Sequence, residues 1–226
     1  MRSIIGTVAL VVVATVAVGA RVSTDETRRI QDSAAVLREI HGTPDKDIPQ
    51  DLWKKAECVI VIPSLKKAAF VVGGEYGKGL MSCRHDGAFG APVFMQLAKG
   101  SWGFQIGAES IDLVLLVMNK RGMDKMLQDK VSLGADASVA AGPVGRNAAA
   151  ATDVQMNAEV ISYSRAQGLF AGIDISGGVL KPDEDANRNL YGRDRSARTV
   201  LTDGTKVPVA AQPFITALRQ YAIASR

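Results

Sequence analysis

Hydrophobic and small polar residues alternate through residues 131–142, in the middle of the chain. The apolar side of this stretch carries Val131, Leu133, Ala135, Ala137, Val139 and Ala141. The other side carries Ser132, Gly134, Asp136, Ser138 and Gly142. A period of two is typical of a β-strand. The stretch therefore predicts one strand with a buried face and a face of unusually small residues.

Two more strands are predicted after the glycine-containing turn at residues 142–147. The first covers residues 159–165, and an alternating apolar set from Leu169 to Val179 predicts the second. The short connection Arg165-Ala166-Gln167-Gly168 between them indicates a hairpin. We expect the rest of the chain to be organised around these three strands.

Helical spacing occurs near both ends of the chain. Ser23 and Glu26 form a capping box, and the apolar residues that follow at helical spacing predict a helix up to Gly42. Pro49 is suited to the first turn of a second, short helix. Residues 182–191 predict a helix with an acidic start, and residues 213–224 predict the last one.

Strand-like runs fill the region between these helices. Cys58 to Ile62 and Ala68 to Val72 predict two strands, with residues 63–67 as their connection. The continuous apolar run from Leu113 to Met118 predicts a central strand that is buried on both faces. Strands in the middle and helices at the ends predict an α+β fold. We expect a mostly antiparallel, strongly curved sheet or barrel-like core with flanking helices.

The first 20 residues are typical of a secretory signal peptide. Arg2 precedes an apolar run, and small residues at Val18-Gly19-Ala20 predict cleavage after Ala20. Residues 21–226 then form a single domain, exported to the periplasm or the extracellular space and peripheral to a membrane. An uncleaved membrane anchor is the alternative, although the apolar run is at the short limit for a span.

The chain has two cysteines, Cys58 and Cys83. An oxidising compartment permits a disulfide between them. Both lie in strand-like runs, and sequence alone does not show whether their Cα atoms come within bridging range. Two buried thiols are the favoured interpretation.

Charge and chemistry point to a binding protein. The formal charge is +4 and the pI is about 9.1, which favours anionic partners but is far from a nucleic-acid footprint. His41 and His85 stand alone, and the sequence has no HExxH, CxxC or nucleophile-elbow motif. We therefore expect no enzyme, no cofactor and no metal site.

Two aspartates leave other interpretations open. Asp136 and Asp174 lie on the small, polar faces of their predicted strands, beside several serines. They line a groove if that face closes over a ligand, and they have no special role if it faces water. A hydrolase that uses either aspartate is a further alternative, although no partner base is evident.

Basic residues are predicted at three turns, at Lys66 and Lys67, at Arg146 and at Arg165. Turns that share one end of the sheet would form a patch for anionic lipid, worth about 1 kcal/mol per cation near a charged membrane. If the turns do not share one end of the sheet, their cations are simply solvated.

Four motifs resemble, in order, the signatures of the SYLF lipid-binding domain family. They are FQIGAE at 104–109, LGADASVAAGPVGRN at 133–147, YSRAQGLFAG at 163–172 and DANRNLYG at 185–192. The similarity covers residues 48–192, most of the predicted mature chain. It implies a non-enzymatic domain that binds phosphoinositides and other anionic phospholipids in eukaryotic members, with a fungal branch that also binds and bundles actin. Bacterial members with such leaders are exported.

The positions that match family motifs are Arg146, Asn147, Tyr163, Arg165, Gly168, Phe170, Asn187 and Tyr191. With the basic turns, they give the candidate lipid-binding residues Lys66, Lys67, Arg146, Asn147, Tyr163, Arg165, Phe170, Asn187 and Tyr191.

We expect an envelope domain that binds anionic phospholipid or another amphiphile at a membrane surface, through basic turns and a small-residue groove. The alternative is a protein-interaction or structural envelope module with a protein partner and no specific lipid ligand. Nucleic acid is not expected as a partner. Actin is not expected either, because an exported bacterial protein would not meet it.

Overall fold

Ten strands form one strongly curled sheet in this computed structural model, which describes residues 22–40, 48–69, 72–102, 107–143, 157–166, 169–193 and 195–223. The strands are β1 (Cys58–Ala69), β2 (Val72–His85), β3 (Ala88–Phe89), β4 (Val93–Trp102), β5 (Gly107–Val117), β6 (Val131–Ser132), β7 (Val139–Ala141), β8 (Val160–Ala166), β9 (Leu169–Gly172) and β10 (Val179–Pro182). The predicted leader, residues 1–20, lies outside the described residues.

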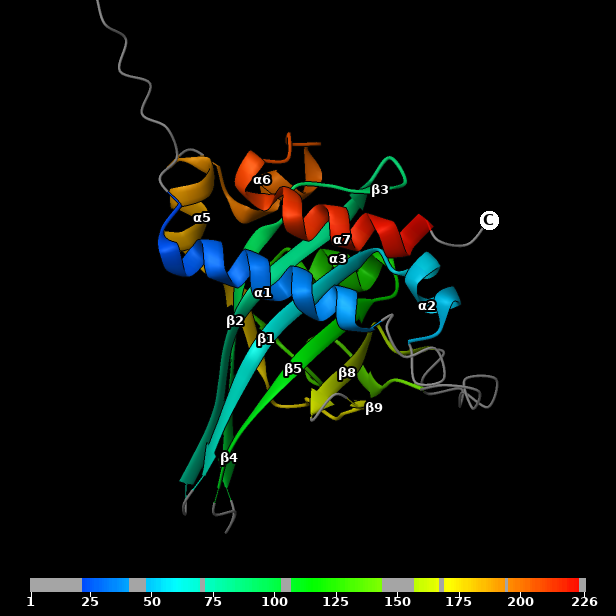
Figure 1. Ribbon diagram of the computed structural model, residues 1–226. Coiled ribbons are helices and arrows are strands. Elements are labelled where there is room, and N and C mark those ends of the chain that lie inside the picture. The colour runs from blue at the N-terminus through cyan, green and yellow to red at the C-terminus, as the bar shows by residue number, and fades with distance from the viewer. Residues whose placement is uncertain are drawn as a thin grey trace, which may run out of the picture.

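Helices flank this sheet (Figure 1). They are α1 (Thr24–Ile40), α2 (Gln50–Lys55), α3 (Lys120–Met126), α5 (Glu184–Tyr191), α6 (Ala197–Thr202) and α7 (Gln212–Ile223), with a short 3-10 helix, η3 (Val209–Ala211). The predicted capping box begins α1, because Ser23 N–H donates to Glu26 Oε2 (2.7 Å) and Glu26 N–H donates to Ser23 Oγ (3.2 Å). No helix within the described residues is long and apolar enough to span a membrane.

The strands follow the order β6-β10-β4-β2-β1-β5-β8-β7, with β3 beside β2 and β9 beside β8. Every strand pair is antiparallel except β7 with β8. The predicted α+β class, with a mostly antiparallel and strongly curved sheet, is confirmed.

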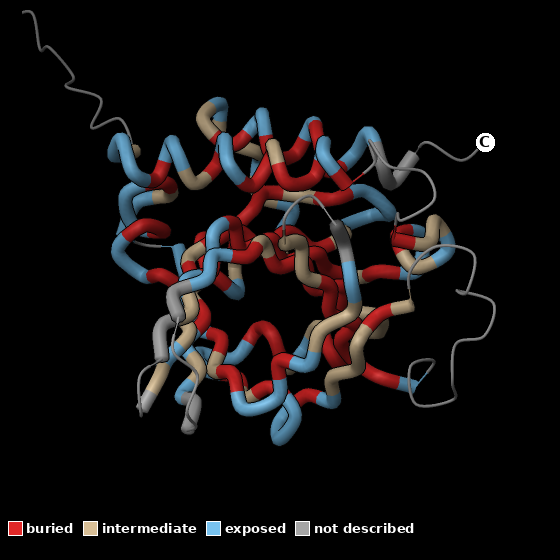
Figure 2. Tube along the Cα trace, turned by 60° about the horizontal axis from the view of Figure 1, so that its bottom comes forward, coloured by how far each residue is buried: buried red, intermediate tan, exposed pale blue. Residues whose placement is uncertain are grey.

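Two clusters of buried side chains cover the two faces of the sheet. Along β1, Cys58 and Ile60 belong to the cluster inside the curl, whereas Val59 and Val61 belong to the cluster under α1 and α7. Buried residues accordingly follow the curled sheet round in Figure 2. The predicted central strand is also confirmed, since residues 113–117 of β5 are fully buried. Continuous apolar runs suit a strand that is covered on both faces.

The predicted strand over residues 131–142 is wrong. Only its ends are strands, β6 and β7, and residues between them form a turn. Asp136 closes this turn, because its carboxylate accepts the Ser132 N–H at 2.7 Å. Gly134 has a φ of +89°, which an L-residue rarely adopts. Local hydrogen bonds of this kind compete with a sheet ladder.

The strand predicted from Leu169 to Val179 is also divided. It ends with β9 at Gly172, and β10 starts at Val179 and pairs with β4 instead. A turn separates the two, in which Asp174 Oδ1 accepts the Ser176 N–H at 2.8 Å. The predicted hairpin before it is confirmed, because β8 and β9 pair Arg165 with Phe170 and Ala166 with Leu169.

Residues 63–67 are not a connection between strands. They lie within β1, which continues through a bulge between Ile62 and Leu65. Ser64 in this bulge has a φ of +51°, and its N–H donates to Asp112 Oδ1 at 2.9 Å. A bulge bends a strand and increases its twist, so β1 stays in the sheet while the sheet curls.

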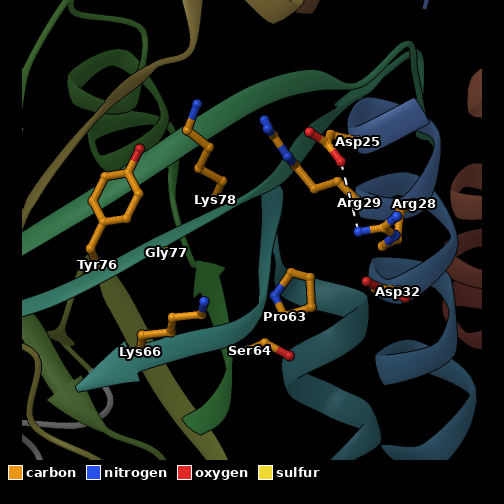
Figure 3. Close-up of a pocket in the computed structure, with 10 residues that line it drawn as sticks. All are labelled: Asp25, Arg28, Arg29, Asp32, Pro63, Ser64, Lys66, Tyr76, Gly77 and Lys78. Atoms are coloured by element: carbon orange, nitrogen blue, oxygen red, sulfur yellow. Dashed lines mark ion pairs between the residues drawn. The ribbon is translucent and has the colours of Figure 1, made fainter. Parts of the chain in front are cut away.

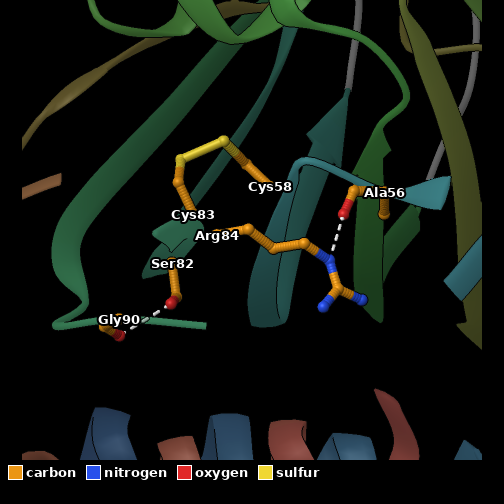
Figure 4. The surroundings of a disulfide bond; sticks show 6 residues. All are labelled: Ala56, Cys58, Ser82, Cys83, Arg84 and Gly90. Atoms are coloured by element: carbon orange, nitrogen blue, oxygen red, sulfur yellow. Dashed lines mark hydrogen bonds between the residues drawn. A yellow bond between two sulfur atoms is a disulfide. The ribbon is translucent and has the colours of Figure 1, made fainter. Parts of the chain in front are cut away.

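Cys58 and Cys83 form a disulfide, so the interpretation as two buried thiols is wrong. The two residues lie directly opposite each other in the β1–β2 ladder, with Cα atoms 4.0 Å apart. Figure 4 shows the bond beside Arg84, whose Nε donates to the Ala56 carbonyl at 2.9 Å. Both cysteines are buried, Cys58 completely.

One end of the sheet extends beyond the helices. Here β4, β2, β1 and β5 continue below α1 in Figure 1 without cover from any labelled helix. β1 and β5 pair from Leu65 with Ile111 to Ala69 with Gly107, and β2 pairs with β4 as far as Val72 with Trp102. We call this four-stranded part the sheet extension.

Candidate functional site

A basic pocket opens between the first turns of α1 and the strands β1 and β2 (Figure 3). Its volume is about 290 Å³. The lining residues are Asp25, Arg28, Arg29, Asp32, Pro63, Ser64, Lys66, Tyr76, Gly77 and Lys78. Four of them are cationic and two are acidic, so positive charge is in excess. Tyr76 adds an aromatic side chain that is 46% exposed.

The β1 bulge shapes this pocket. It places Pro63 and Ser64 on the wall opposite α1. Gly77 of β2 faces the bulge, and a Cβ at this position would lie 2.5 Å from Ile62 Cγ2 and 2.8 Å from Leu65 Cδ1. Only glycine allows β2 to pass this close to the bulge, so the pocket depends on one small residue.

An internal carboxylate holds two of the pocket cations. Asp183 Oδ2 accepts from Arg29 Nη1 at 2.8 Å and from Lys78 Nζ at 2.9 Å. Burial alone would raise the pKa of Asp183, but these two cations hold that pKa below its usual value. The hydrogen bond to Asp183 raises the pKa of Lys78 against its partial burial. The two cations are therefore fixed in place, one on α1 and one on β2.

We expect Asp183→Asn to lower the free energy of unfolding at pH 7 by about 2–3 kcal/mol, less than for a fully buried pair because Lys78 is partly exposed. A carboxylate whose pKa is depressed by folding stabilises the protein above its unfolded pKa of about 3.9, and this stability is lost as the pH falls through the folded pKa. As the pH falls below about 4, the free energy of unfolding should therefore decrease less for the variant than for the native chain. Urea unfolding at several pH values measures both effects.

Asp86→Asn is the control for this prediction, because the Asp86 side chain is 92% exposed. Its free energy of unfolding should stay within about 0.5 kcal/mol of the native value. Equal losses in the two variants would show that the Asp183 ion pairs contribute nothing specific.

Of the predicted binding residues whose side chains the structure describes, only Lys66 lines the pocket. It is exposed and makes no ion pair with any described residue. Lys67 follows it in β1 and so points to the opposite face, where its Nζ lies 3.9 Å from Glu75 Oε1. The structure therefore separates the two lysines that the sequence placed in one basic turn.

Arg165 is partly buried in an ion-pair network. Its Nη2 lies 2.5 Å from Asp112 Oδ2, and it also pairs with Glu39 of α1. These contacts connect the last part of α1 with β5 and β8. Arg165 thus has internal carboxylate partners and does not line the basic pocket.

Three other predicted residues make hydrogen bonds to the main chain, buried for Asn187 and partly buried for the two tyrosines. Asn187 is 1% exposed, accepts the Phe94 N–H at 2.7 Å and donates to the Phe94 carbonyl at 3.0 Å. The hydroxyls of Tyr163 and Tyr191 donate to the carbonyls of Pro143 and Pro92. Burial also raises the pKa of Tyr191. These side chains hold β4, β8 and α5 in position.

The remaining predicted residues are outside what the structure describes. Arg146 and Asn147 fall in residues 144–156, and the side chain of Phe170 is not described, although its backbone pairs in β9. Their predicted role in lipid binding stays a prediction.

A second, polar cleft lies beside α3. Its lining residues are Asn119, Lys120, Arg121, Lys125, Gly134, Ala135, Asp136, Ser138, Asn157 and Glu159. Its buried carboxylate, Glu159, binds Lys125 Nζ at 2.7 Å through both oxygens. Asp136 lines this cleft with the small residues Gly134, Ala135 and Ser138, but most of the lining is charged or carries amides, and Asp174 is not part of it.

Both aspartates accept hydrogen bonds from serines of their own segments. Hydrogen bonds from Ser132 lower the pKa of Asp136, and those from Ser176 lower the pKa of Asp174. A carboxylate is a more efficient general base when its pKa lies closer to the operating pH, and these shifts are in the other direction. The two carboxylates close turns within their own segments.

Sequence reasoning missed most of the basic pocket. Arg28 and Arg29 were visible as cations on the polar side of the first helix, and Lys78 in a glycine-rich segment. Only the docking of α1 beside the β1 bulge brings them together. The signal available in the sequence was the adjacent pair Arg28 and Arg29 near the start of the helix, where the helix dipole disfavours positive charge.

Known proteins that are similar to this chain point to one family. Residues 98–221 match the family described as Ysc84, Las17-binding protein actin regulator. The chain is 37% identical over 171 residues to an SH3 domain-containing protein of Schizosaccharomyces pombe, covering 74% of the chain and 40% of that protein. It is 32% identical over 182 residues to Protein YSC84 of Saccharomyces cerevisiae, covering 79% of the chain and 39% of that protein. It is 33% identical over 187 residues to the human SH3 domain-containing YSC84-like protein 1, covering 80% of the chain and 54% of that protein.

The chain spans between about two fifths and just over half of the length of these relatives. The expectation that actin is excluded as a partner is wrong, because the matching family is itself described as an actin regulator. Other relatives are named for binding a protein, as LAS seventeen-binding protein 3 of Saccharomyces cerevisiae is. On the family match and on these identities, the chain belongs to the Ysc84 family, whose domain is called SYLF.

Proposed function

We propose that this chain is a non-enzymatic protein-interaction module that binds an acidic surface of a protein partner, with actin filaments as the first candidate. The basic pocket between α1, β1 and β2 is the observation that carries the proposal. The description of the family as an actin regulator supports a protein ligand over a lipid one. The pocket lies before residue 98, outside the matched residues, so its role is inferred from its charges.

The distribution of charge favours a ligand with carboxylates. Arg29 and Lys78 both form ion pairs with Asp183. Lys66 makes no ion pair with any described residue, and the Arg28 side chain is 67% exposed. Arg28 lies 3.7 Å from Asp25, a surface pair of small energy. Arg28 and Lys66 are therefore available to an incoming acidic group. Exposed cations of this kind act mainly on the association rate and its dependence on salt.

A non-enzymatic role agrees with the chemistry of the described residues. The candidate carboxylates have lowered pKa values, which is the wrong direction for a base. The family is described by what it binds and regulates.

Cosedimentation with actin filaments tests the proposal. We expect the native chain to pellet with filaments and the double variant Arg28→Glu/Lys66→Glu to bind at least about tenfold more weakly, a loss of about 1.4 kcal/mol. Raising the salt concentration should weaken native binding more than variant binding. The matched control is Lys120→Glu/Arg121→Glu, which makes the same charge change at the second cleft and should bind within about threefold of native.

Absence of native binding to filaments would overturn the choice of actin. Equal losses in the two double variants would remove the pocket from the proposal, because net charge alone would explain them. Vesicles with and without anionic lipid form a parallel arm of the experiment. Binding to anionic vesicles but not to filaments would favour the lipid prediction over the protein one.

A further inference from the structure

On the β5 side, the sheet extension has an edge that no strand of the described residues covers. β5 pairs with β1 from Gly107 onward, but its pairing with β8 begins only at Asp112, opposite Arg165. On the β8 side, residues 107–111 therefore have no strand partner among the described residues. Figure 1 shows this end of β5 below β8 and β9. Unpaired backbone N–H and C=O groups at such an edge are a template for another strand.

A row of alternating charges crosses the extension and ends at this edge. Lys99 of β4 lies opposite Glu75 of β2, Glu75 lies opposite Lys67 of β1, and Lys67 lies opposite Glu109 of β5. The signs are therefore positive, negative, positive and negative. Glu109 is exposed and makes no ion pair with any described residue. The next strand in this alternation would place a cation beside it.

We propose that the β5 edge over Gly107–Ile111 accepts an extended segment of a partner protein as an added strand, with a lysine or arginine opposite Glu109. Backbone hydrogen bonds would supply the affinity of such an addition and the side chains its specificity. Opposite charges directly across a ladder are favourable, and like charges are unfavourable. Glu109 therefore selects the charge of the incoming strand.

Symmetric pairing with a second copy of the chain is disfavoured at this edge. Two β5 edges paired about a two-fold axis at residue 109 would place Glu109 opposite its own copy, which like-charge repulsion disfavours. Inward-pointing charges on edge strands prevent self-association in many sheets. The carboxylate thus disfavours this symmetric pairing and admits a basic strand.

This site is separate from the basic pocket. By the alternation of side chains along a strand, the charged row lies on the inner face of the sheet with Leu65 and Ile111. Lys66, Tyr76 and Lys78 lie on the helix-side face. The inference goes beyond the proposed function and requires a basic segment where the pocket requires an acidic one, so either can fail alone.

Titration with two synthetic peptides, followed by amide NMR of the full chain, tests the inference. The probes are acetyl-Thr-Val-Lys-Val-Thr-amide and the same peptide with glutamate in place of lysine. We expect the lysine peptide to shift the amide signals of residues 107–111 and to bind about fivefold or more tightly than the glutamate peptide. Glu109→Lys should reverse this order.

Glu184→Lys is the control, since it makes the same charge change at an exposed position on α5 and should leave the preference unchanged. Overlapping amide spectra away from residue 109 will show that both variants are folded. Shifts confined to the basic pocket, no preference between the peptides, or no reversal in Glu109→Lys would each overturn the inference. So would a concentration-dependent dimer through the same amides.

Discussion

Replacing Tyr163 by alanine is expected to lower the free energy of unfolding by about 3–5 kcal/mol, the usual range for a large aromatic residue in a core. Tyr163 is fully buried in the cluster under the helices. Its ring packs against the backbone of Gly142, where a Cβ would lie 2.0 Å from Tyr163 Cζ. The truncation would leave a cavity between β8 and the end of β7. Urea denaturation of the purified variant measures the loss.

Tyr163→Phe separates the ring from its hydroxyl. This variant removes the hydroxyl and with it the hydrogen bond to the Pro143 carbonyl, 3.0 Å long, and should cost about 1 kcal/mol. If Tyr163 instead served mainly to contact a ligand, both variants would unfold at the native urea concentration and lose binding. That result would contradict the structural role assigned to it.

Loss of the Cys58–Cys83 disulfide is expected to lower the free energy of unfolding by roughly 3.5 kcal/mol. The value follows from the 25-residue separation of the two cysteines and the chain entropy that their bond removes from the unfolded state. The double variant Cys58→Ala/Cys83→Ala tests it. The variant should bind its partner like the native chain at a temperature where both are folded, because the disulfide contacts neither pocket.

Reduction provides the control for the disulfide prediction. A reducing agent should lower the thermal midpoint of the native chain towards that of the double variant and leave the variant unchanged. An unchanged midpoint in the native chain under full reduction, verified by thiol counting, would contradict an energetic role for the bond.

The sequence predicted the fold class because its strongest signals are local. The continuous apolar run in β5 and the capping box of Ser23 and Glu26 depend on neighbouring residues only, and both are present. Strand ends were less predictable. The alternation over residues 131–142 is compatible with a strand, but Asp136 and Gly134 turn the chain there through contacts that periodicity does not encode.

Features that depend on register could not be predicted in the same way. Cys58 and Cys83 are opposite each other only because β1 and β2 pair in one register, 25 residues apart in sequence. Lys66 and Lys67 were placed in one turn, whereas a bulge keeps them in a strand and sends them to opposite faces. A shift of one residue changes the face of every side chain in a strand.

The same limit applies to the candidate site. Motif positions such as Asn187 and Tyr191 could be found from the sequence, but their hydrogen bonds to β4 and to Pro92 could not. The pocket cations come from α1, β1 and β2, and no motif joins them. Their arrangement is a property of tertiary packing.

Asp183 makes the pocket and the packing of α5 thermodynamically dependent on each other. Any anion that draws Arg29 or Lys78 towards itself must compete with a carboxylate already in place, so dilute buffer ions are poor competitors. An occupant that succeeds weakens the link between α1, β2 and the start of α5. By reciprocity, a change that loosens α5 must alter the affinity of the pocket by the same factor.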